Sequence, residues 1–246
     1  DVVFPALHGL WGEGGQLQDL LQSSGLPFVG CRAPAARVAM DKILTKVLAI
    51  KLSVPVPRAG IINPRDPACP IDLPAVVKPV HEGSSVGLHL VHTQEDWARA
   101  HAAASKDTLA TGRAYMVERY IRGREITVGV LAPGRPDCLV LPPIEIAPKS
   151  GIFDYDAKYN REDTVYTVGP VLPPGVEATL RSTALRLAIG MEMRHLCRID
   201  FRLDHLCAPW LLEINTMPGF TSHSLVPMAA AKAGLGFPAL CERLVD

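Results

Sequence analysis

The chain has 246 residues, with 25 lysines and arginines against 25 aspartates and glutamates, so its formal net charge is zero. A balanced charge gives no electrostatic basis for binding nucleic acid or an acidic membrane, and no apolar run reaches the roughly 18 residues of a membrane-spanning helix. The six cysteines are scattered without a C-x-x-C pair, which favours a reducing compartment over a disulfide framework or a zinc site. We therefore expect a cytoplasmic protein large enough for more than one domain.

The first residues predict the tail of an α/β unit. Asp1–Leu7 is an apolar strand, HGLWGEGG is a glycine-rich loop, QLQDLLQSSG is an amphipathic helix closed by Gly25, and PFVG is a second strand. No initiator methionine or signal peptide precedes Asp1, so we expect the native protein to begin further upstream.

Helices and strands alternate through the middle of the chain. MDKILTKVLAIKLSVPVP predicts a helix that stops before Pro55, and TQEDWARAHAAAS predicts a helix with Thr93 as its N-cap. AVVKP and LHLV read as two strands joined by the loop HEGSSVG. YMVERYI and REITVGVL predict a hairpin that turns at Arg122–Gly123.

The last part of the chain opens with a loop-rich stretch from Pro142 to Pro174. VEATLRSTALRLAIGM then predicts a long helix, CRIDFRL and WLLEIN predict two strands, and SLVPMAAAKAGL predicts a well-packed helix near the end. In CRIDFRL the alternation of side chains places the apolar residues on one face and Asp200 on the other. In WLLEIN, Glu213 and Asn215 lie opposite an apolar face that comprises Trp210, Leu212 and Ile214.

If these two strands form a hairpin through DHLCAP, pairing Leu203 with Trp210 brings Asp200 opposite Glu213. Carboxylate and amide oxygens suit Mg²⁺, which completes its coordination with water and substrate phosphates. Arg198 on the same face would repel a purely structural cation and favours an anion lying on the metal. A solvated sheet face with ion pairs is the alternative, and the PGF turn and TSHS loop that follow favour a site.

The loop HEGSSVG joins two strands and therefore differs from a Walker loop, which leads from a strand into a helix. Its backbone N–H groups and the hydroxyls of Ser84 and Ser85 could cover phosphate. Lys78 at its start and Lys42 on the preceding helix could neutralise the phosphate charge. A simple surface hairpin is the alternative for the loop taken alone.

The segment VERYIRGRE places Glu118 and Glu125 on either side of a tight turn. Such a segment could offer backbone groups to an adenine edge and carboxylates to a ribose. Solvated strand ends are the alternative interpretation of these charges.

Taken in order, these stretches resemble the ATP-grasp superfamily and, within it, the D-alanine–D-alanine ligases. The resemblance covers nearly the whole chain and rests on LHGLWGEGGQLQ, MDK, VVKPVHEGSSVG, VERYIRGREITV, DYDAKY, RIDF and LLEINTMPGFTSHSLVPMA, of which DYDAKY and NTMPGFTSHSL are specific to the ligases. It implies an α/β (α+β) fold in which two subdomains sandwich ATP after the tail of a Rossmann-like domain. The implied divisions are 1–32 for that tail, 33–121 for the central subdomain and 122–246 for the C-terminal subdomain.

The resemblance also implies a reaction. ATP phosphorylates the carboxylate of one D-alanine, and the amine of a second D-alanine attacks the acylphosphate to give the dipeptide used in peptidoglycan synthesis. The implied cofactors are ATP and two Mg²⁺ ions, with Mn²⁺ as a possible replacement, and the implied assembly is a homodimer.

Roles follow from matching positions within the resemblance. Metal binding falls to Asp200, Glu213 and Asn215. ATP binding falls to nine residues: Lys42, Lys78, Ser85, Glu118, Arg119, Tyr120, Ile121, Glu125 and Lys158. The second substrate falls to Ser224 and Leu225, and the first lies near His8. Catalytic roles fall to five residues. Arg198 and the N–H of Gly219 would stabilise the oxyanion, and His8 would lie near the first substrate. Tyr159 would belong to a lid, a mobile loop that closes over the site, and would bond to Ser84 in the closed state.

The sequence departs from the family pattern at three peripheral positions: Gly14 replaces an acid, Arg119 replaces a common lysine, and Phe153 replaces a common tyrosine. A glutamate that holds the first substrate's ammonium lies in the family's N-terminal domain, and no residue of this chain takes that role. Two alternatives remain: a related ligase with D-serine or D-lactate as acceptor, or a nucleotide-binding module without turnover. Tyr159 favours an amino-acid acceptor, and the intact polar strand faces speak against the module.

Overall fold

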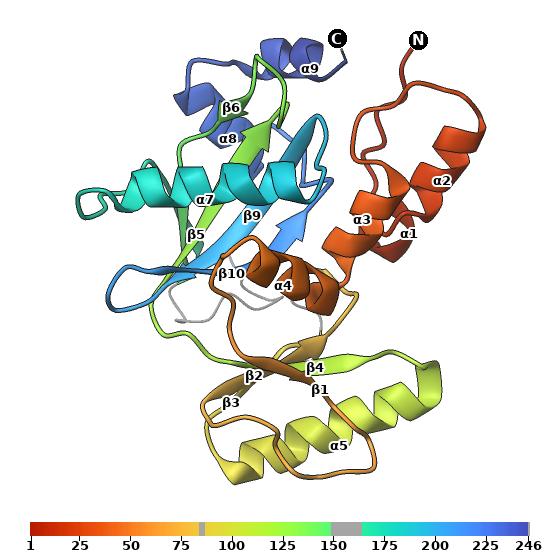
Figure 1. Ribbon diagram of the computed structural model, residues 1–246, viewed down its shortest axis with the longest axis vertical. Coiled ribbons are helices and arrows are strands. Elements are labelled where there is room, and N and C mark those ends of the chain that lie inside the picture. Colours follow the sequence, from red (N-terminus) through yellow and green to blue (C-terminus); the bar gives the residue numbers. More distant parts are fainter. Residues whose placement is uncertain (84–86, 149–163, 246) are drawn as a thin grey trace.

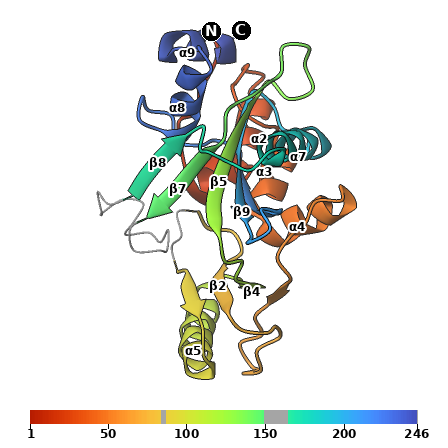
Figure 2. The same ribbon diagram turned by 90° about the vertical axis from the view of Figure 1, so that its left-hand side faces the viewer.

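The computed structural model describes residues 1–83, 87–148 and 164–245. Within these ranges the strands form two antiparallel sheets (Figure 1). The four-stranded sheet has the order β1-β4-β2-β3 and comprises β1 (Ala59–Ile61), β2 (Ala75–Pro79), β3 (His89–Val91) and β4 (Tyr115–Arg119). The six-stranded sheet has the order β10-β9-β5-β7-β8, with β6 paired to β5, and comprises β5 (Arg124–Leu131), β6 (Leu139–Val140), β7 (Ile144–Pro148), β8 (Thr164–Val168), β9 (Leu196–Leu203) and β10 (Pro209–Asn215). The six-stranded sheet lies above the four-stranded sheet along the long axis of the molecule (Figure 2). Both chain termini lie at the end of the molecule that is remote from the four-stranded sheet.

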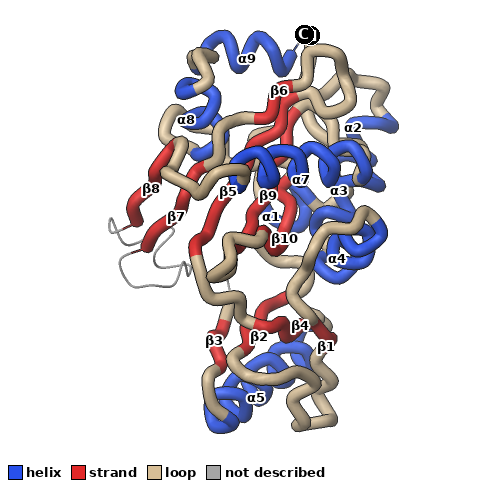
Figure 3. Tube along the Cα trace, turned by 60° about the vertical axis from the view of Figure 1, so that its left-hand side comes forward, coloured by secondary structure: helices blue, strands red, loops and turns tan. Residues whose placement is uncertain are grey.

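Helices cover both sheets (Figure 3). The elements are α1 (Gly9–Glu13), α2 (Gln16–Ser23), α3 (Ala33–Met40), α4 (Lys42–Lys51), α5 (Gln94–Thr111), α7 (Val176–Gly190), α8 (Leu225–Lys232) and α9 (Phe237–Val245). Helix α5 packs on the four-stranded sheet, whereas α7 crosses the six-stranded sheet. Helices α3 and α4 precede the four-stranded sheet in the chain but contact β10 of the six-stranded one. Among the described helices, none combines the length and the apolar character needed to cross a membrane.

The main core lies between α7 and the middle of the six-stranded sheet. Leu180 and Leu187 of α7 pack with Ile126 of β5 and Phe201 of β9, and all four side chains are fully buried. Burial of side chains of this size stabilises a fold by about 1.5–3 kcal/mol each. The predicted alternation in β9 is confirmed, because Cys197, Ile199, Phe201 and Leu203 all belong to this core. The polar residues of β9 therefore point away from this core, and Asp200 and Arg202 line the pocket between the two sheets.

The first thirty residues differ in detail from the prediction. The two predicted strands reduce to one isolated parallel bridge between Val3 and Phe28. The predicted glycine-rich loop contains the short helix α1, whereas the predicted amphipathic helix is present as α2. Leu17 and Leu21 of α2 pack against Phe28, so the apolar stripe of this helix is what holds the segment together.

The predicted hairpin at Arg122–Gly123 is wrong. Strand β4 pairs with β1 and β2, whereas β5 pairs with β7 and β9, so the turn is the crossover between the two sheets. Gly123 has φ +144°, and a Cβ at this position would lie 1.8 Å from the carbonyl oxygen of Leu203. The turn residues fitted a hairpin equally well, because local turn chemistry does not identify the partner of each strand. We refer to Arg119–Gly123 as the hinge.

Other elements were not predicted or were predicted too short. Helix α3, helix α9 and strands β1 and β6 have no counterpart in the sequence analysis, and β7 and β8 lie within the stretch expected to be loop-rich. Helix α5 begins at its predicted N-cap, where the side chain of Thr93 accepts the N–H of Asp96. It continues beyond the predicted end to Gly112, whose φ of +76° closes the helix.

Candidate active site

A pocket lies between the two sheets, and residues from both contribute to its wall. Nine residues that the sequence analysis assigned to ATP or metal line this one pocket: Lys42, Lys78, Glu118, Arg119, Tyr120, Ile121, Glu125, Asp200 and Glu213. Apolar side chains complete the wall, namely Val76, Leu88, Leu90 and Leu212. An apolar wall beside convergent charged groups suits an organic ligand that carries both a ring and charged groups.

Asp200 and Glu213 are direct partners on β9 and β10, as the sequence analysis expected. The expected pairing of Leu203 with Trp210 is wrong, because Leu203 pairs with Pro209 and the register shifts by one between Leu211 and Glu213. The bulge leaves Leu212 without a partner on β9. Leu211 and Ile214 therefore both enter the core, whereas Leu212 lines the pocket beside Glu213 instead of sharing a face with Ile214.

The carboxylate of Asp200 is buried and accepts hydrogen bonds on both oxygens. Arg198 donates from Nε at 2.9 Å and from its terminal nitrogen at 2.8 Å, which is a bidentate pair. Thr127 Oγ1 donates at 2.6 Å, and Asn215 Nδ2 donates at 3.0 Å. Burial disfavours the charged guanidinium of Arg198, but Asp200 outweighs this effect and raises the pKa of Arg198. Arg198 is therefore a fixed cation at the edge of the set.

The donor set of Asp200, Glu213 and Asn215 fits a hard divalent cation such as Mg²⁺. Its third member is an amide, and this set therefore differs from a cluster of three His, Cys, Asp or Glu side chains, of which the described residues contain none. Asn215 presents its NH₂ group to Asp200 here, and a half-turn of the amide would present its carbonyl oxygen instead. Because Asp200 already accepts four hydrogen bonds, a cation would have to replace at least one of its present partners.

Glu118 lies between two buried lysines. Its oxygens are 2.7 Å from Lys46 Nζ and 2.5 Å from Lys78 Nζ, and the side chains of all three residues are at most 10% exposed. Burial opposes the ionisation of Glu118, but the two ammonium groups outweigh it and hold its pKa at about 2. The carboxylate therefore fixes the two cations at the wall of the pocket.

Lys46 was missed by the sequence analysis. It lies four residues after Lys42 on α4, so the helical period places both ammonium groups on one face, and that spacing is the signal that could have found it. Burial lowers the pKa of Lys46 and also that of Lys42. Lys42 Nζ lies 3.6 Å from Glu213 and donates to the carbonyl oxygen of Glu82. The lysines and the predicted metal ligands therefore belong to one connected site.

Arg202 organises the hinge and was likewise missed as a site residue. It donates to the carbonyl oxygen of Ile121, to the Tyr120 hydroxyl at 2.8 Å and to Glu125 at 3.1 Å. Its guanidinium also lies over the Tyr120 ring, 5.2 Å from the centroid. Glu125, expected to take a ribose, is thus held by a cation at the pocket wall.

The residues expected to meet the amino-acid substrates lie at the start of two helices. His8 precedes α1, and Ser224 precedes α8, whose first residue is Leu225. Ser224 Oγ accepts the N–H of Thr221 at 3.0 Å, and it would lie 3.2 Å from a Cβ placed on Gly219. The absence of a side chain at Gly219 therefore keeps the PGF turn in close contact with the TSHS loop.

Glu13 is a third residue that the sequence analysis passed over. Its carboxylate accepts the N–H of Gly9 at 3.0 Å and interacts electrostatically with His8, Arg198 and Glu213. Burial raises its pKa. It lines a small pocket with Lys42, Glu213 and Asn215, so the glycine-rich N-terminal stretch reaches the polar faces of β9 and β10. Four of the expected site residues lie outside the described residues, namely Ser84, Ser85, Lys158 and Tyr159. Phe153, which departs from the family pattern, also lies outside them.

Comparisons with known proteins agree with this geometry. The family description "D-ala D-ala ligase C-terminus" matches residues 67–246. The chain is 40% identical over 247 residues to a D-alanine–D-alanine ligase of Bordetella avium, and the match covers 99% of this chain and 76% of that protein. It is 40% identical over 251 residues to a ligase of the same name from Laribacter hongkongensis, with 100% and 78% covered.

Solved structures lead to the same family. The D-alanine-D-alanine ligase from Coxiella burnetii has a TM-score of 0.84 at 30% identity, with 100% of this chain and 66% of that chain covered. The VanG D-Ala:D-Ser ligase from Enterococcus faecalis has a TM-score of 0.85 at 28% identity, with 100% and 72% covered. The chain therefore belongs to the D-alanine–D-alanine ligase family and has the ATP-grasp fold of that family.

Proposed function

We propose that this chain carries the ATP-binding and ligating machinery of an enzyme that joins two D-alanine molecules. The single observation that carries the proposal is the pairing of Asp200 with Glu213 on the pocket face, with Arg198 fixed beside them. A carboxylate oxygen of the first D-alanine attacks the γ-phosphorus of ATP, and ADP leaves. The amine nitrogen of the second then attacks the acyl carbon, loses a proton, and phosphate leaves with the C–O bond electrons.

The buried lysines would bind the nucleotide phosphates. Lys42 and Lys78 line the pocket together, and their ammonium groups are nearly shielded from water. Phosphoryl transfer depends mainly on positioning and charge neutralisation, which fixed cations in a poorly solvated site supply. Glu118 keeps Lys78 in place, and the Leu88, Leu90 and Leu212 side chains would contact the adenine. The hinge residues Arg119–Ile121 would bind the adenine edge.

The residues Asp200, Glu213 and Asn215 would hold Mg²⁺, two ions in our proposal, or Mn²⁺ in their place. When bound, these ions neutralise charge on the nucleotide phosphates. Arg198 would stabilise the oxyanion formed during peptide bond formation, together with the N–H of Gly219. Its bidentate pair with Asp200 aims the guanidinium along the sheet face.

The acceptor would be bound at the start of α8. Ser224 would bind its carboxylate, with Leu225 beside it and His8 near the first substrate. The similarity to a D-Ala:D-Ser ligase makes D-serine the second candidate acceptor. Ser84, Ser85, Lys158 and Tyr159 complete the proposal as groups that cover the phosphates. We also propose that the enzyme is a cytoplasmic homodimer, which rests on the family alone.

The test is the release of phosphate from ATP with D-alanine, D-serine or D-lactate as the added substrate. The proposal expects release that depends on D-alanine and formation of the D-alanyl-D-alanine dipeptide. Release with D-alanine plus D-serine and formation of the mixed dipeptide would support the second candidate. Binding of an ATP analogue without any substrate-dependent release would instead identify a nucleotide-binding module and contradict both ligase assignments.

A further inference from the structure

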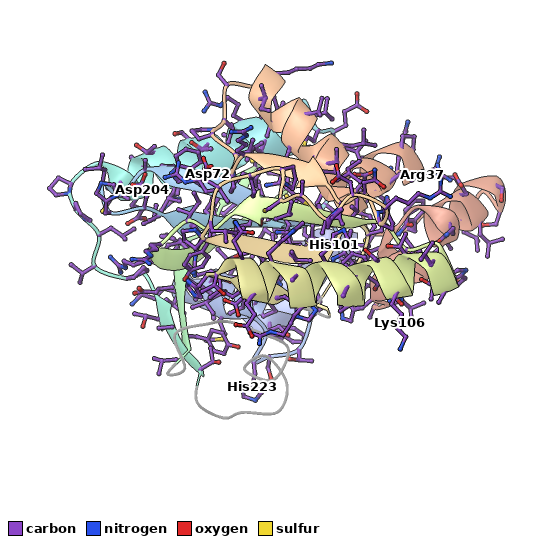
Figure 4. The ribbon with its side chains drawn as sticks, turned by 90° about the horizontal axis from the view of Figure 1, so that it is seen from below. Arg37, Asp72, His101, Lys106, Asp204 and His223 are labelled. Carbon is purple, nitrogen blue, oxygen red and sulfur yellow. The ribbon has the colours of Figure 1, made fainter. Side chains whose placement is uncertain are left out.

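A second cavity of about 710 Å³ lies beside the hinge. Its walls come from both sheets: Arg58 and the Ile71–Pro74 segment belong to the four-stranded side, and His205 and Trp210 belong to the β9–β10 side. Asp72 and Asp204, which also line it, lie at the same edge of the molecule (Figure 4). Arg119, Tyr120 and Ile121 line both this cavity and the ATP pocket, whereas the other residues that line the cavity have no role in the proposed reaction.

Three arginines line this cavity, Arg58, Arg119 and Arg122. The N–H of Arg119 donates to the carbonyl oxygen of Arg58 at 2.9 Å, so the two residues are neighbours across the β1–β4 pair. Like charges at neighbouring positions of adjacent strands destabilise a sheet unless another charge compensates them. Within the described residues, none of the three forms an ion pair within 4.0 Å, whereas Arg124, Arg198 and Arg202 all do.

The two carboxylates in the cavity do not neutralise the arginines. Asp204 accepts the N–H groups of Leu206 and Ala208 and the indole N–H of Trp210 at 2.9 Å. The indole hydrogen bond is the main reason that the pKa of Asp204 is lowered. Asp72 is exposed, and it forms no ion pair with an arginine of the described residues. With three cations against two carboxylates, the cavity has a surplus positive charge and unused guanidinium donors.

We propose that this hinge cavity is an anion-binding site for a small organic phosphate, held by Arg58 beside the four-stranded sheet and by Arg119 and Arg122 of the hinge. Guanidinium groups bind phosphate through two parallel N–H···O bonds, and three of them favour a ligand with more than one phosphoryl group. The cavity is large enough for a sugar-sized ligand, and the rings of Trp210 and Tyr120 provide a rigid wall. A ligand touching Arg58 and Arg122 together would link the four-stranded sheet to the hinge.

The test is a calorimetric titration with fructose 1,6-bisphosphate as the probe, in the presence of a saturating non-hydrolysable ATP analogue that occupies the ATP pocket. The double variant Arg58→Ala/Arg122→Ala should weaken binding of the probe by about tenfold or more, because two of the three charged donors are lost. Asp72→Asn should tighten binding, because it removes a carboxylate that repels the probe. Arg186→Ala, an exposed arginine of α7 outside the cavity, is the matched control and should leave the affinity unchanged.

Equal affinities in the wild type, the double variant and Asp72→Asn would overturn the proposal, and so would a lack of binding to the wild type. Binding of the ATP analogue to each variant shows that the variant is folded, because neither Arg58 nor Arg122 lines the ATP pocket. The result is independent of the ligase assignment, which is judged by phosphate release with D-alanine.

Discussion

Asp200 and Glu213 face one another across β9 and β10 because a bulge at Leu212 shifts the register by one residue. Without the bulge, the pairing of Leu211 with Phe201 would continue and place Leu212 opposite Asp200. The same bulge turns the Leu212 side chain into the pocket between the two sheets. One irregularity in a strand therefore builds both a carboxylate pair and an apolar wall of the pocket.

Glu213→Gln should lower the turnover rate by a factor on the order of 100 or more while leaving the fold intact. The substitution keeps the size of the side chain, which is partly exposed, but removes the charge that would hold a divalent cation. Phosphate release with D-alanine measures the rate, and thermal unfolding measures the fold. Glu242→Gln, an exposed position on α9, is the control and should keep full activity. A Glu213→Gln enzyme with normal turnover would remove this residue from the metal site.

Lys46→Met should raise the KM for ATP by about tenfold. With Lys46 gone, Glu118 has only Lys78 to neutralise it, so Lys78 is held more strongly by Glu118 and is less available to phosphate. The control is Lys51→Met, because Lys51 is exposed on the same helix. An unchanged KM for ATP in Lys46→Met, with Lys51→Met also unchanged, would show that Lys46 serves stability alone.

Gly123→Ala should destabilise the protein more than Gly134→Ala. Both glycines have positive φ, at +144° and +76°, so both substitutions incur backbone strain of about 1–2 kcal/mol. Only Gly123 has a carbonyl oxygen 1.8 Å from the new Cβ, whereas Gly134 has open space. Overpacking should therefore add about 1–3 kcal/mol at Gly123. Free energies of unfolding from urea titrations test this difference, and equal losses at the two positions would mean that the hinge can relax around the added atom.

The stability of the protein should fall as the pH decreases from about 4.5 to about 2, in part because of Glu118. Its folded pKa lies below the ordinary value of 4.5, so its contribution is complete above pH 4.5 and is lost as the pH falls through about 2. That shift corresponds to a contribution on the order of 3 kcal/mol. Glu118→Gln should be less stable than the wild type at pH 7, and the difference should shrink in acid. A difference that stays constant over this range would show that Glu118 does not ionise with a depressed pKa in the folded protein.

The pattern of polar and apolar residues along β9 was readable from the sequence, whereas the shared face predicted for Leu212 and Ile214 of β10 was wrong. Alternation placed Asp200 opposite the core, and the strand hypothesis brought Glu213 to it across the hairpin. The register nevertheless needed a bulge, and no local signal in WLLEIN marks Leu212 as the extra residue. The bulge satisfies two burial demands at once, since Leu211 and Ile214 both enter the core. Competition between neighbouring side chains for core space is a tertiary effect.

The lysine cluster shows the same division. The sequence placed Lys42 and Lys78 near phosphate, and both line the pocket. It did not reveal that Glu118 would be buried between Lys46 and Lys78, because those three residues come from α4, β4 and β2. A charge is tolerated in such a place only when its partners arrive from other elements.

By itself, the sequence determined the type of most long elements, the polar face of β9 and the family to which the chain belongs. The tertiary structure decided that β4 and β5 enter different sheets, that β10 bulges at Leu212, and which cations surround Glu118. The physical reason is range. Periodicity and turn chemistry act over a few residues, whereas strand pairing and the neutralisation of buried charge depend on groups that only the folded chain brings together.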